Sequence, residues 1–168
     1  KLDSIRKIEK IYNLKINKFI EYPLILEKLI NNISDLLKNK NSIFLTIDYG
    51  EESRICNDTV QAIYKNKKSN ILQNVGESDI TYQVNFFHLI KLFKKNKLHL
   101  VEFTTQSNFL QKLGIKERAV NAKKNLKKNQ QLLLDGALKR LLHPLEMGSL
   151  FKVLIISNQY NTDFKYDI

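Results

Sequence analysis

The chain has 168 residues, of which 43% are hydrophobic and 27% charged, and its formal net charge is +11 at pH 7. This composition is typical of one folded domain and excludes a disordered tail. No apolar run approaches the ~20 residues that a transmembrane helix needs, so no membrane span is expected.

The first predicted elements are a helix and a buried strand. Apolar residues recur at helical spacing over Leu26–Leu37, behind Pro23, which suits the first turn of a helix. The run Ile43–Ile47 is short and nearly continuously apolar, which predicts a strand covered on both faces, and the chain is expected to turn at Asp48-Tyr49-Gly50. A helix followed by a fully buried strand is half of a β-α-β unit, so the sequence predicts an α/β fold.

The later elements are predicted from periodicity, caps and breakers. They are a short strand over Thr59–Tyr64, a helix over Phe86–Phe93 capped by Asp79 or Thr81, a strand over Leu98–Phe103, a short helix over Phe109–Leu113 closed by Gly114, a helix over Leu132–Leu142 ended by Pro144, and a strand over Phe151–Ile156. We expect residues 1–157 to belong to one domain and residues 158–168 to form a polar tail.

Several classes of site are excluded by the motifs. His88, His99 and His143 are far apart and none has an acid at ligand spacing, so no metal site is expected. No GxSxG elbow, Walker loop or GxGxxG turn occurs, and no catalytic residue is assigned. Cys56 is the single cysteine and is interpreted as a free thiol, which favours a reducing compartment and a cytoplasmic location.

The positive charge has two interpretations. A nucleic-acid-binding face needs clustered cations, preferably with stacking aromatics. Here the excess is nearly all Lys, accompanied by abundant Asn and Ile, as an AT-rich genome would encode. We therefore expect the cations to be scattered and no nucleic acid to be bound, and a basic nucleic-acid-binding protein is kept as the weakest alternative.

One segment stands out as a candidate site. Asp48-Tyr49-Gly50 follows a buried strand, and ligands of open α/β sheets bind beyond the carboxyl ends of the strands. A carboxylate, an aromatic ring and a glycine at that edge suit a functional role as well as they suit a helix N-cap or a turn.

Several blocks of the sequence share one pattern of order and spacing. The blocks are Ile47-Asp48-Tyr49-Gly50, Thr59-Val60-Gln61-Ala62, Gly76-Glu77-Ser78-Asp79-Ile80-Thr81, Val84-Asn85-Phe86, Thr105-Gln106-Ser107-Asn108-Phe109-Leu110, Gly114-Ile115-Lys116-Glu117-Arg118 and Met147-Gly148-Ser149-Leu150-Phe151-Lys152-Val153-Leu154. Together they resemble one known family, the class I S-adenosylmethionine-dependent methyltransferases typified by the mitochondrial complex I assembly-factor arginine methyltransferase and its bacterial relatives. The order and spacing agree from Glu21 to Leu154.

The resemblance implies a Rossmann-like sheet of seven strands that binds S-adenosylmethionine, and N-methylation of an arginine on a partner protein, a respiratory complex I subunit in the mitochondrial case. It makes Ile43–Ile47 strand five, Leu98–Phe103 strand six and Phe151–Ile156 strand seven, with strand seven antiparallel between the other two. Strand five is then an apolar edge strand, which is prone to association.

The resemblance also implies that this chain is the C-terminal part of such an enzyme. The Gly-rich loop and the acidic residue that hold the cofactor in the family would precede Lys1, so no cofactor is expected for this chain alone. The single methionine, Met147, agrees with a piece of a longer product. Asn66, Val75 and Asn85 depart from the residues usual in relatives.

Two readings of the function follow. In the first, the chain is a methyltransferase segment, inactive alone, whose substrate side is formed by Asp48, Tyr49, Gly50, Asp79, Thr81 and Gln106, placed by the resemblance only. In the second, it is a non-catalytic remnant or interaction module that complements a separate N-terminal half.

Overall fold

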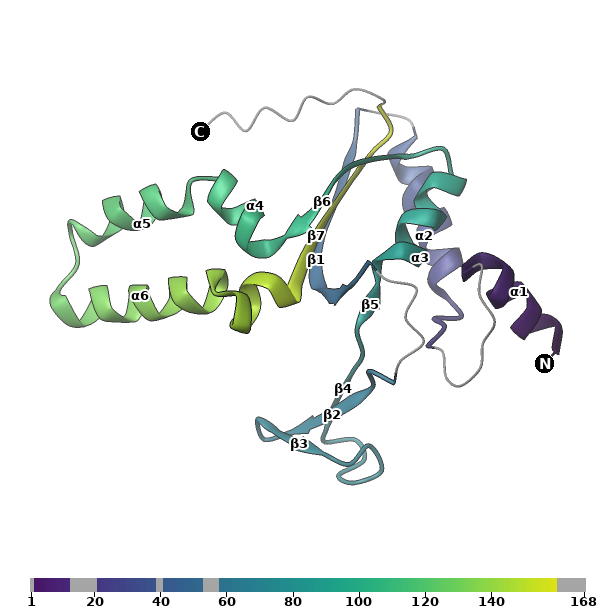
Figure 1. Ribbon diagram of the computed structural model, residues 1–168, viewed down its shortest axis with the longest axis horizontal. Helices are drawn as coiled ribbons and strands as arrows, with labels where there is room; N and C mark the ends of the chain where they lie inside the picture. The colour runs from purple at the N-terminus through teal and green to yellow at the C-terminus, as the bar shows by residue number, and fades with distance from the viewer. Residues whose placement is uncertain (1, 13–20, 39–40, 53–57, 160–168) are drawn as a thin grey trace.

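The computed structural model describes residues 2–12, 21–38, 41–52 and 58–159, and its elements form a mixed α/β fold (Figure 1). In chain order they are α1 Leu2–Tyr12, α2 Leu26–Leu37, β1 Ile43–Glu51, β2 Gln61–Tyr64, β3 Lys67–Ser69, β4 Asp79–Thr81, β5 Val84–Asn85, α3 Phe86–Lys95, β6 His99–Thr105, α4 Gln106–Lys112, α5 Ile115–Lys123, α6 Lys128–Leu142, the turn η1 Pro144–Gly148 and β7 Phe151–Ser157.

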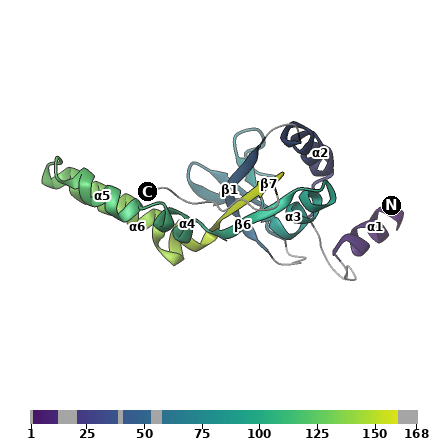
Figure 2. The ribbon, with the colours of Figure 1, turned by 90° about the horizontal axis from the view of Figure 1, so that it is seen from above.

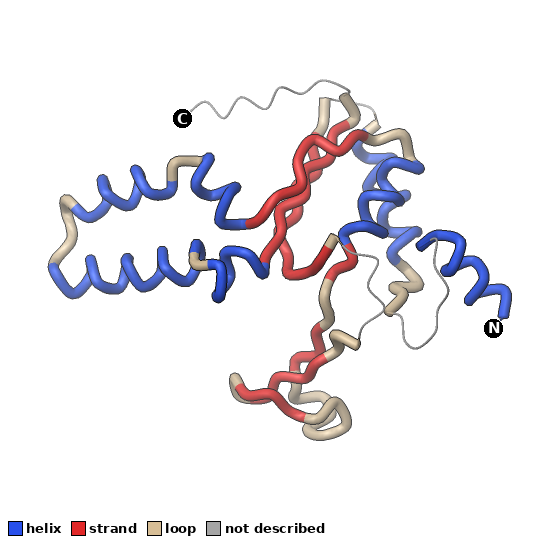
Figure 3. The backbone as a smooth tube through the Cα atoms, in the orientation of Figure 1, coloured by secondary structure: helices blue, strands red, loops and turns tan. Residues whose placement is uncertain are grey.

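The central sheet has the strand order β5-β1-β7-β6. β7 lies between β1 and β6 and is antiparallel to both, so the predicted order of the three long strands is confirmed. Figure 3 shows the strands of this sheet in red, with helices on either side in blue. β5 is parallel to β1 and pairs with it only at Gly50 and Glu51. No described strand pairs with the rest of that edge of β1, from Ile43 to Tyr49.

One face of the sheet holds the main core. α2 and α3 pack there, and Phe86 and Phe93 of α3 have no exposed surface. They meet Leu154 and Ile156 of β7, which point to this face because side chains alternate along a strand. Phe44 of β1 stacks at a tilt on Phe93, with ring centroids 5.1 Å apart. Burial of these side chains is the largest stabilising contribution to the fold.

The opposite face is covered only in part. Val153 and Ile155 of β7 are buried there against Phe109 of α4. Ile43, Leu45 and Ile47 of β1 lie on the same face and are 45%, 45% and 39% exposed. The prediction that this strand is covered on both faces is therefore wrong for the described residues: α4 packs over β7, and no described element packs over β1 on that side.

Two arms project from the sheet. β2, β3 and β4 form a separate small antiparallel sheet, with a turn at Lys65 and Asn66. α5 and α6 form a helical hairpin that extends away from the sheet, on the side opposite α2 and α3 (Figures 1 and 2). No residue of α6 is fully buried.

Local sequence signals predicted the positions of most helices but not all of their ends. Gly114 has φ +71°, as predicted for the stop after α4. α6 begins at Lys128, four residues before the predicted start, and α1 and α5 were not predicted. The N-cap of α3 is Asn85, whose Oδ1 accepts from the His88 backbone N at 2.9 Å. The caps predicted from Asp79 or Thr81 are wrong, because both residues lie in β4.

Two absences hold within the described part of the chain. No described helix is both long and apolar enough to cross a membrane. No group of three or more His, Cys, Asp or Glu side chains among the described residues is placed to bind a metal ion. Of the predicted polar tail, Asn158 and Gln159 are described, and the rest lies outside the described residues, as does Cys56.

Candidate functional site

The candidate site lies at the carboxyl end of β1. The strand continues through Asp48-Tyr49-Gly50 to Glu51, so the turn predicted at these residues is wrong. The strand continues to Glu51 because it pairs with a neighbouring strand on each side: Tyr49 pairs with Phe151 of β7, and Gly50 pairs with Val84 of β5. The residues that the sequence singled out are thus held in a sheet, at the edge where α/β folds bind ligands.

Three residues from distant segments are tied together beside this strand end. Thr59 donates two hydrogen bonds to Glu21, one from its backbone N–H and one from its hydroxyl. Each goes to a different carboxylate oxygen, and each donor–acceptor distance is 2.6 Å. The Thr59 Oγ1 also accepts from the backbone N of Gln83 at 2.9 Å. Because charge-assisted hydrogen bonds of this kind are the strong ones, they fix Glu21 and Gln83 relative to each other.

A pocket opens on one side of this network. Its wall is largely apolar, formed by side chains such as Pro23, Leu26 and Leu89, and two carboxylates, Glu21 and Glu51, also line it. The remaining lining residues are Thr59, Tyr82, Gln83, Val84, Asn85 and His88. Apolar walls with a few convergent polar groups are typical of ligand pockets. We call this hollow the acidic pocket, since Glu21 and Glu51 are its charged residues.

A second hollow lies on the other side of Thr59 and Gln83. Tyr49 and Thr81 line it, together with Lys68 and Phe151. The ring of Tyr49 packs edge-on against Phe151, with centroids 5.5 Å apart, so its position is fixed by an aromatic contact. Two of the predicted site residues are therefore brought to one place.

His88 forms part of the wall of the acidic pocket. It is 1% exposed, and its ring lies 5.3 Å from that of Tyr22. Burial lowers the pKa of His88 below its usual 6.5, outweighing the opposite effect of Glu27. The imidazole is therefore neutral at pH 7, and because both of its nitrogens are shielded from solvent we assign it to the wall and not to proton transfer.

The other predicted site residues lie apart from these two hollows. Asp48 is on the face of β1 that α2 and α3 cover, with its Oδ1 accepting from the Tyr49 backbone N at 2.8 Å. Asp79 is exposed at the start of β4. Gln106 is buried and donates to the carbonyl of Leu141 at 3.0 Å, which ties α4 to α6. Their assignment to the cleft stays a prediction.

Sequence reasoning missed Glu21, Glu51 and Thr59. Thr59 opens one of the blocks that carry the resemblance, but its contact with Glu21, 38 residues away, belongs to no local motif. Glu51 follows the tripeptide that was singled out, and the only available signal was its place next to a strand end. From the sequence, His88 was considered only as a metal ligand and excluded; the structure buries it in the wall of the acidic pocket.

Comparison of the sequence with known protein families identifies the family of this chain. A family model described as "Putative S-adenosyl-L-methionine-dependent methyltransferase" matches residues 3–104. The chain belongs to this family. No match was found among curated proteins.

Two solved structures from Burkholderia thailandensis share the fold. A native crystal structure of an uncharacterized protein superimposes with a TM-score of 0.69 at 23% identity, covering 78% of this chain and 36% of that one. A "likely methyl transferase" bound to S-adenosyl-homocysteine has a TM-score of 0.66 at 22% identity, covering 78% of this chain and 35% of that one. At these identities the likeness shows the fold, and the chain spans about a third of the length of either structure.

The glycines of this chain do not fit the turn that holds such a cofactor. A Gly-rich turn brings several glycine backbones against the ligand. Here Gly50 is packed on the Val84 backbone and Gly148 on the Leu142 carbonyl, whereas Gly76 lies singly between β3 and β4, Gly114 between α4 and α5, and Gly136 within α6. We therefore derive no step of the reaction through cofactor contacts made by these residues.

Proposed function

We propose that this chain forms the acceptor side of an S-adenosylmethionine-dependent protein methyltransferase whose methyl acceptor is an arginine side chain. The observation that carries the proposal is the acidic pocket, which places Glu21 and Glu51 at the carboxyl end of β1. The membership in a methyltransferase family supports the reaction class. The resemblance to arginine methyltransferases supports the acceptor, with a respiratory complex I subunit as the substrate by analogy.

The pocket suits the two parts of an arginine side chain. Its apolar wall, including Pro23, Leu26 and Leu89, would pack against the methylene stem, since such stems bury well beside apolar surface. The carboxylates of Glu21 and Glu51 would accept hydrogen bonds from the planar guanidinium, which offers five N–H donors. Because Thr59 already holds both oxygens of Glu21, this carboxylate is pre-positioned, and its role is to orient and to supply negative charge.

We propose further that the cofactor is held by a polypeptide segment other than the one described. The lack of a Gly-rich turn in residues 1–168 supports this. Residues Ile43–Tyr49 of β1, which have no described strand on one side, offer a place where a parallel strand of that segment would pair. Cofactor binding by this chain alone is then not expected. The cytoplasmic location stays a prediction.

The second candidate function is an interaction module without catalysis. It is favoured by the exposed apolar face of β1, formed by Ile43, Leu45 and Ile47, which suits contact with another protein segment whether or not a reaction follows. The two candidates differ in one outcome, because only the first requires methyl transfer once the cofactor-binding segment is supplied.

The test is a methyl-transfer assay with tritiated S-adenosylmethionine. The 168-residue chain is mixed with the part of the Burkholderia thailandensis methyl transferase that it does not cover, and an arginine peptide is offered beside its lysine counterpart. We expect label only in the arginine peptide and only in the mixture, and Glu51→Gln to lower the rate about tenfold to a hundredfold, as the loss of one charged hydrogen bond implies. Label in the lysine peptide alone, or an unchanged rate in Glu51→Gln, would refute the acceptor assignment.

A further inference from the structure

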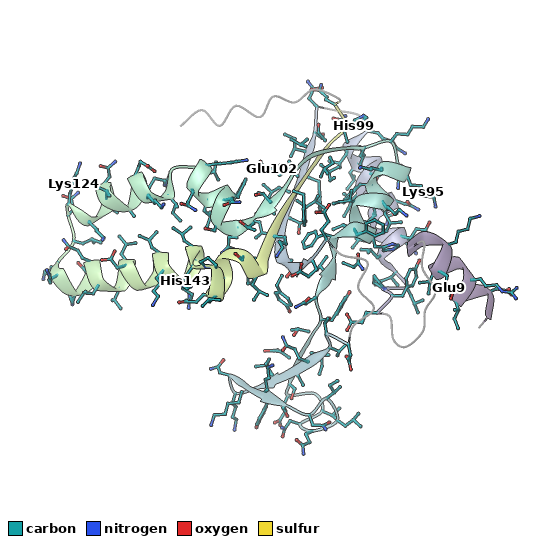
Figure 4. All side chains as sticks on the ribbon, viewed as in Figure 1. Glu9, Lys95, His99, Glu102, Lys124 and His143 are labelled. Atoms are coloured by element: carbon teal, nitrogen blue, oxygen red, sulfur yellow. The ribbon has the colours of Figure 1, made fainter. Side chains whose placement is uncertain are left out.

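The α5–α6 hairpin concentrates the positive charge of the protein. Residues 115–142 hold eight Lys and Arg residues and two acidic ones, so the hairpin carries a net charge of +6 out of the +11 of the whole chain. The net charge is therefore uneven along the chain, although 20 of its 28 Lys and Arg residues lie outside the hairpin. Lys124 lies at the tip and His143 at the base of the hairpin (Figure 4).

The hairpin is built as a rigid unit. Gln131 donates from Nε2 to the carbonyls of Lys123 and Leu126, at 3.1 and 3.0 Å, which fixes the turn between the helices. Lys123 also forms an ion pair with Asp135 across the hairpin. At the base, the Gln106 side chain holds the carbonyl of Leu141. The surface between the helices is therefore pre-organised, which lowers the entropic cost of binding a partner.

That surface is an apolar groove. Ile115, Ala119 and Ala122 of α5 and Leu134 and Leu138 of α6 line it. The small, exposed side chain of Ala122 permits a partner backbone to approach closely. A concave apolar groove of this kind is the usual seat of an amphipathic helix, which inserts side chains at helical spacing.

The positive charge around the groove favours a partner that is negatively charged. Arg118 lines the groove, and on α6 the exposed Lys139 and Arg140 stand in sequence between the groove residues Leu138 and Leu141. Among the described residues, none of these three has an acidic partner within ion-pair distance. Unpaired cations around an apolar groove complement an acidic rim and raise the rate at which such a partner is captured.

We infer that the groove between α5 and α6 docks an acidic amphipathic helix of a partner protein. A nucleic acid is disfavoured because residues 115–142 contain no Phe, Tyr or Trp on which bases would stack, and phosphates gain nothing from an apolar groove. A membrane surface is disfavoured because it is flat, whereas the apolar side chains here line a concavity. This inference is independent of the arginine acceptor, since it involves no residue of the acidic pocket.

The test measures binding of a labelled peptide to the full chain by fluorescence anisotropy. The probe is a helical peptide of about 20 residues with Leu at every third or fourth position and Glu elsewhere, compared with the same peptide carrying Lys in place of Glu. We expect the acidic peptide to bind and the basic one not to bind. Arg118→Glu combined with Arg140→Glu should weaken binding about tenfold or more, because two attractions become repulsions.

A matched control separates local charge from net charge. Lys28→Glu combined with Lys67→Glu makes the same change in total charge on α2 and β3, where both lysines are exposed, and should leave binding within about twofold. Leu138→Gln, checked for helix content by circular dichroism, should also weaken binding because it makes the groove polar. Equal binding of both peptides, equal loss in the control pair, or tighter binding of double-stranded DNA or phosphatidylserine vesicles than of the acidic peptide would overturn the inference.

Discussion

Gly50 lies directly against Val84: a Cβ atom placed on Gly50 would be 2.1 Å from the carbonyl oxygen of Val84. The contact joins β1 to β5, and both strands contribute to the acidic pocket, through Glu51 on one side and Val84 on the other. Glycine at this position is therefore what permits the two strands to approach closely enough to form the pocket wall.

The first prediction concerns this contact. Gly50→Ala should destabilise the protein by about 1–3 kcal/mol, because backbone atoms of Val84 would have to move. Gly136→Ala is the matched control: it lies inside α6, with nothing within 4 Å of an added Cβ, and should stabilise the helix by about 0.5–1 kcal/mol. Urea unfolding of both variants checks the opposite signs, and a loss of stability in Gly136→Ala equal to that in Gly50→Ala would contradict the packing argument.

The second prediction concerns the hydrogen bonds around Thr59. Thr59→Val keeps the shape of the side chain but removes the hydroxyl that donates to Glu21 and accepts from Gln83. It should cost about 1–3 kcal/mol of stability, because a partly buried carboxylate loses a donor. Thr104→Val in β6, where the Thr104 hydroxyl has no comparable bonds to carboxylate or backbone groups among the described residues, should stay within about 0.5 kcal/mol of the parent protein. Chemical denaturation measures both, and equal effects would show that the network is not stabilising.

The third prediction is a pH dependence that arises from His88. Burial lowers the pKa of His88 in the folded protein below 6.5, so the unfolded chain binds a proton first as the pH falls. This contribution to stability is fully present above pH 6.5 and is lost as the pH falls from 6.5 through the folded-state pKa. His88→Phe should remove that part of the slope. Unfolding free energies measured at several pH values above and below 6.5 test it, and identical slopes in parent and variant would refute the assignment.

The fourth prediction concerns self-association. The exposed apolar face of β1, with its open edge, should make the isolated chain associate at high concentration. Leu45→Lys should shift sedimentation toward the monomer, because a charge on the face of an edge strand opposes pairing. Leu72→Lys removes a more exposed leucine (84%) that lies in a loop, and should have little effect. If both substitutions act alike, general hydrophobicity and not the strand edge drives association.

The sequence predicted those features of the fold that are indicated by residues close together in the chain. The order of the three long strands was predicted because Phe151–Ile156 is apolar except at Lys152, as suits a central strand, and because the family resemblance placed it between the other two. The apolar character of Ile43–Ile47 led to a wrong prediction. It predicts a strand covered on both faces, whereas the described residues cover only one face of this strand.

The site was less predictable because its residues meet only in three dimensions. Tyr49 and Gly50 were found from their place at the end of a strand: Tyr49 lines the second hollow, and Gly50 lines neither hollow but lets β1 approach Val84 closely. Glu21 reaches the site through Thr59, a contact across 38 residues that no local pattern contains. Gln106 was included on resemblance, and its side chain holds the base of α6.

The central claim, that the acidic pocket accepts a guanidinium, is tested most directly by calorimetric titration of the 168-residue chain. The ligand is a short arginine peptide, and its control is the same peptide with citrulline, which has nearly the shape of arginine without the charge. The account predicts that the arginine peptide binds, that citrulline does not, and that Glu51→Gln weakens binding about tenfold or more. Equal binding of both peptides, or an unchanged affinity in Glu51→Gln, would contradict it.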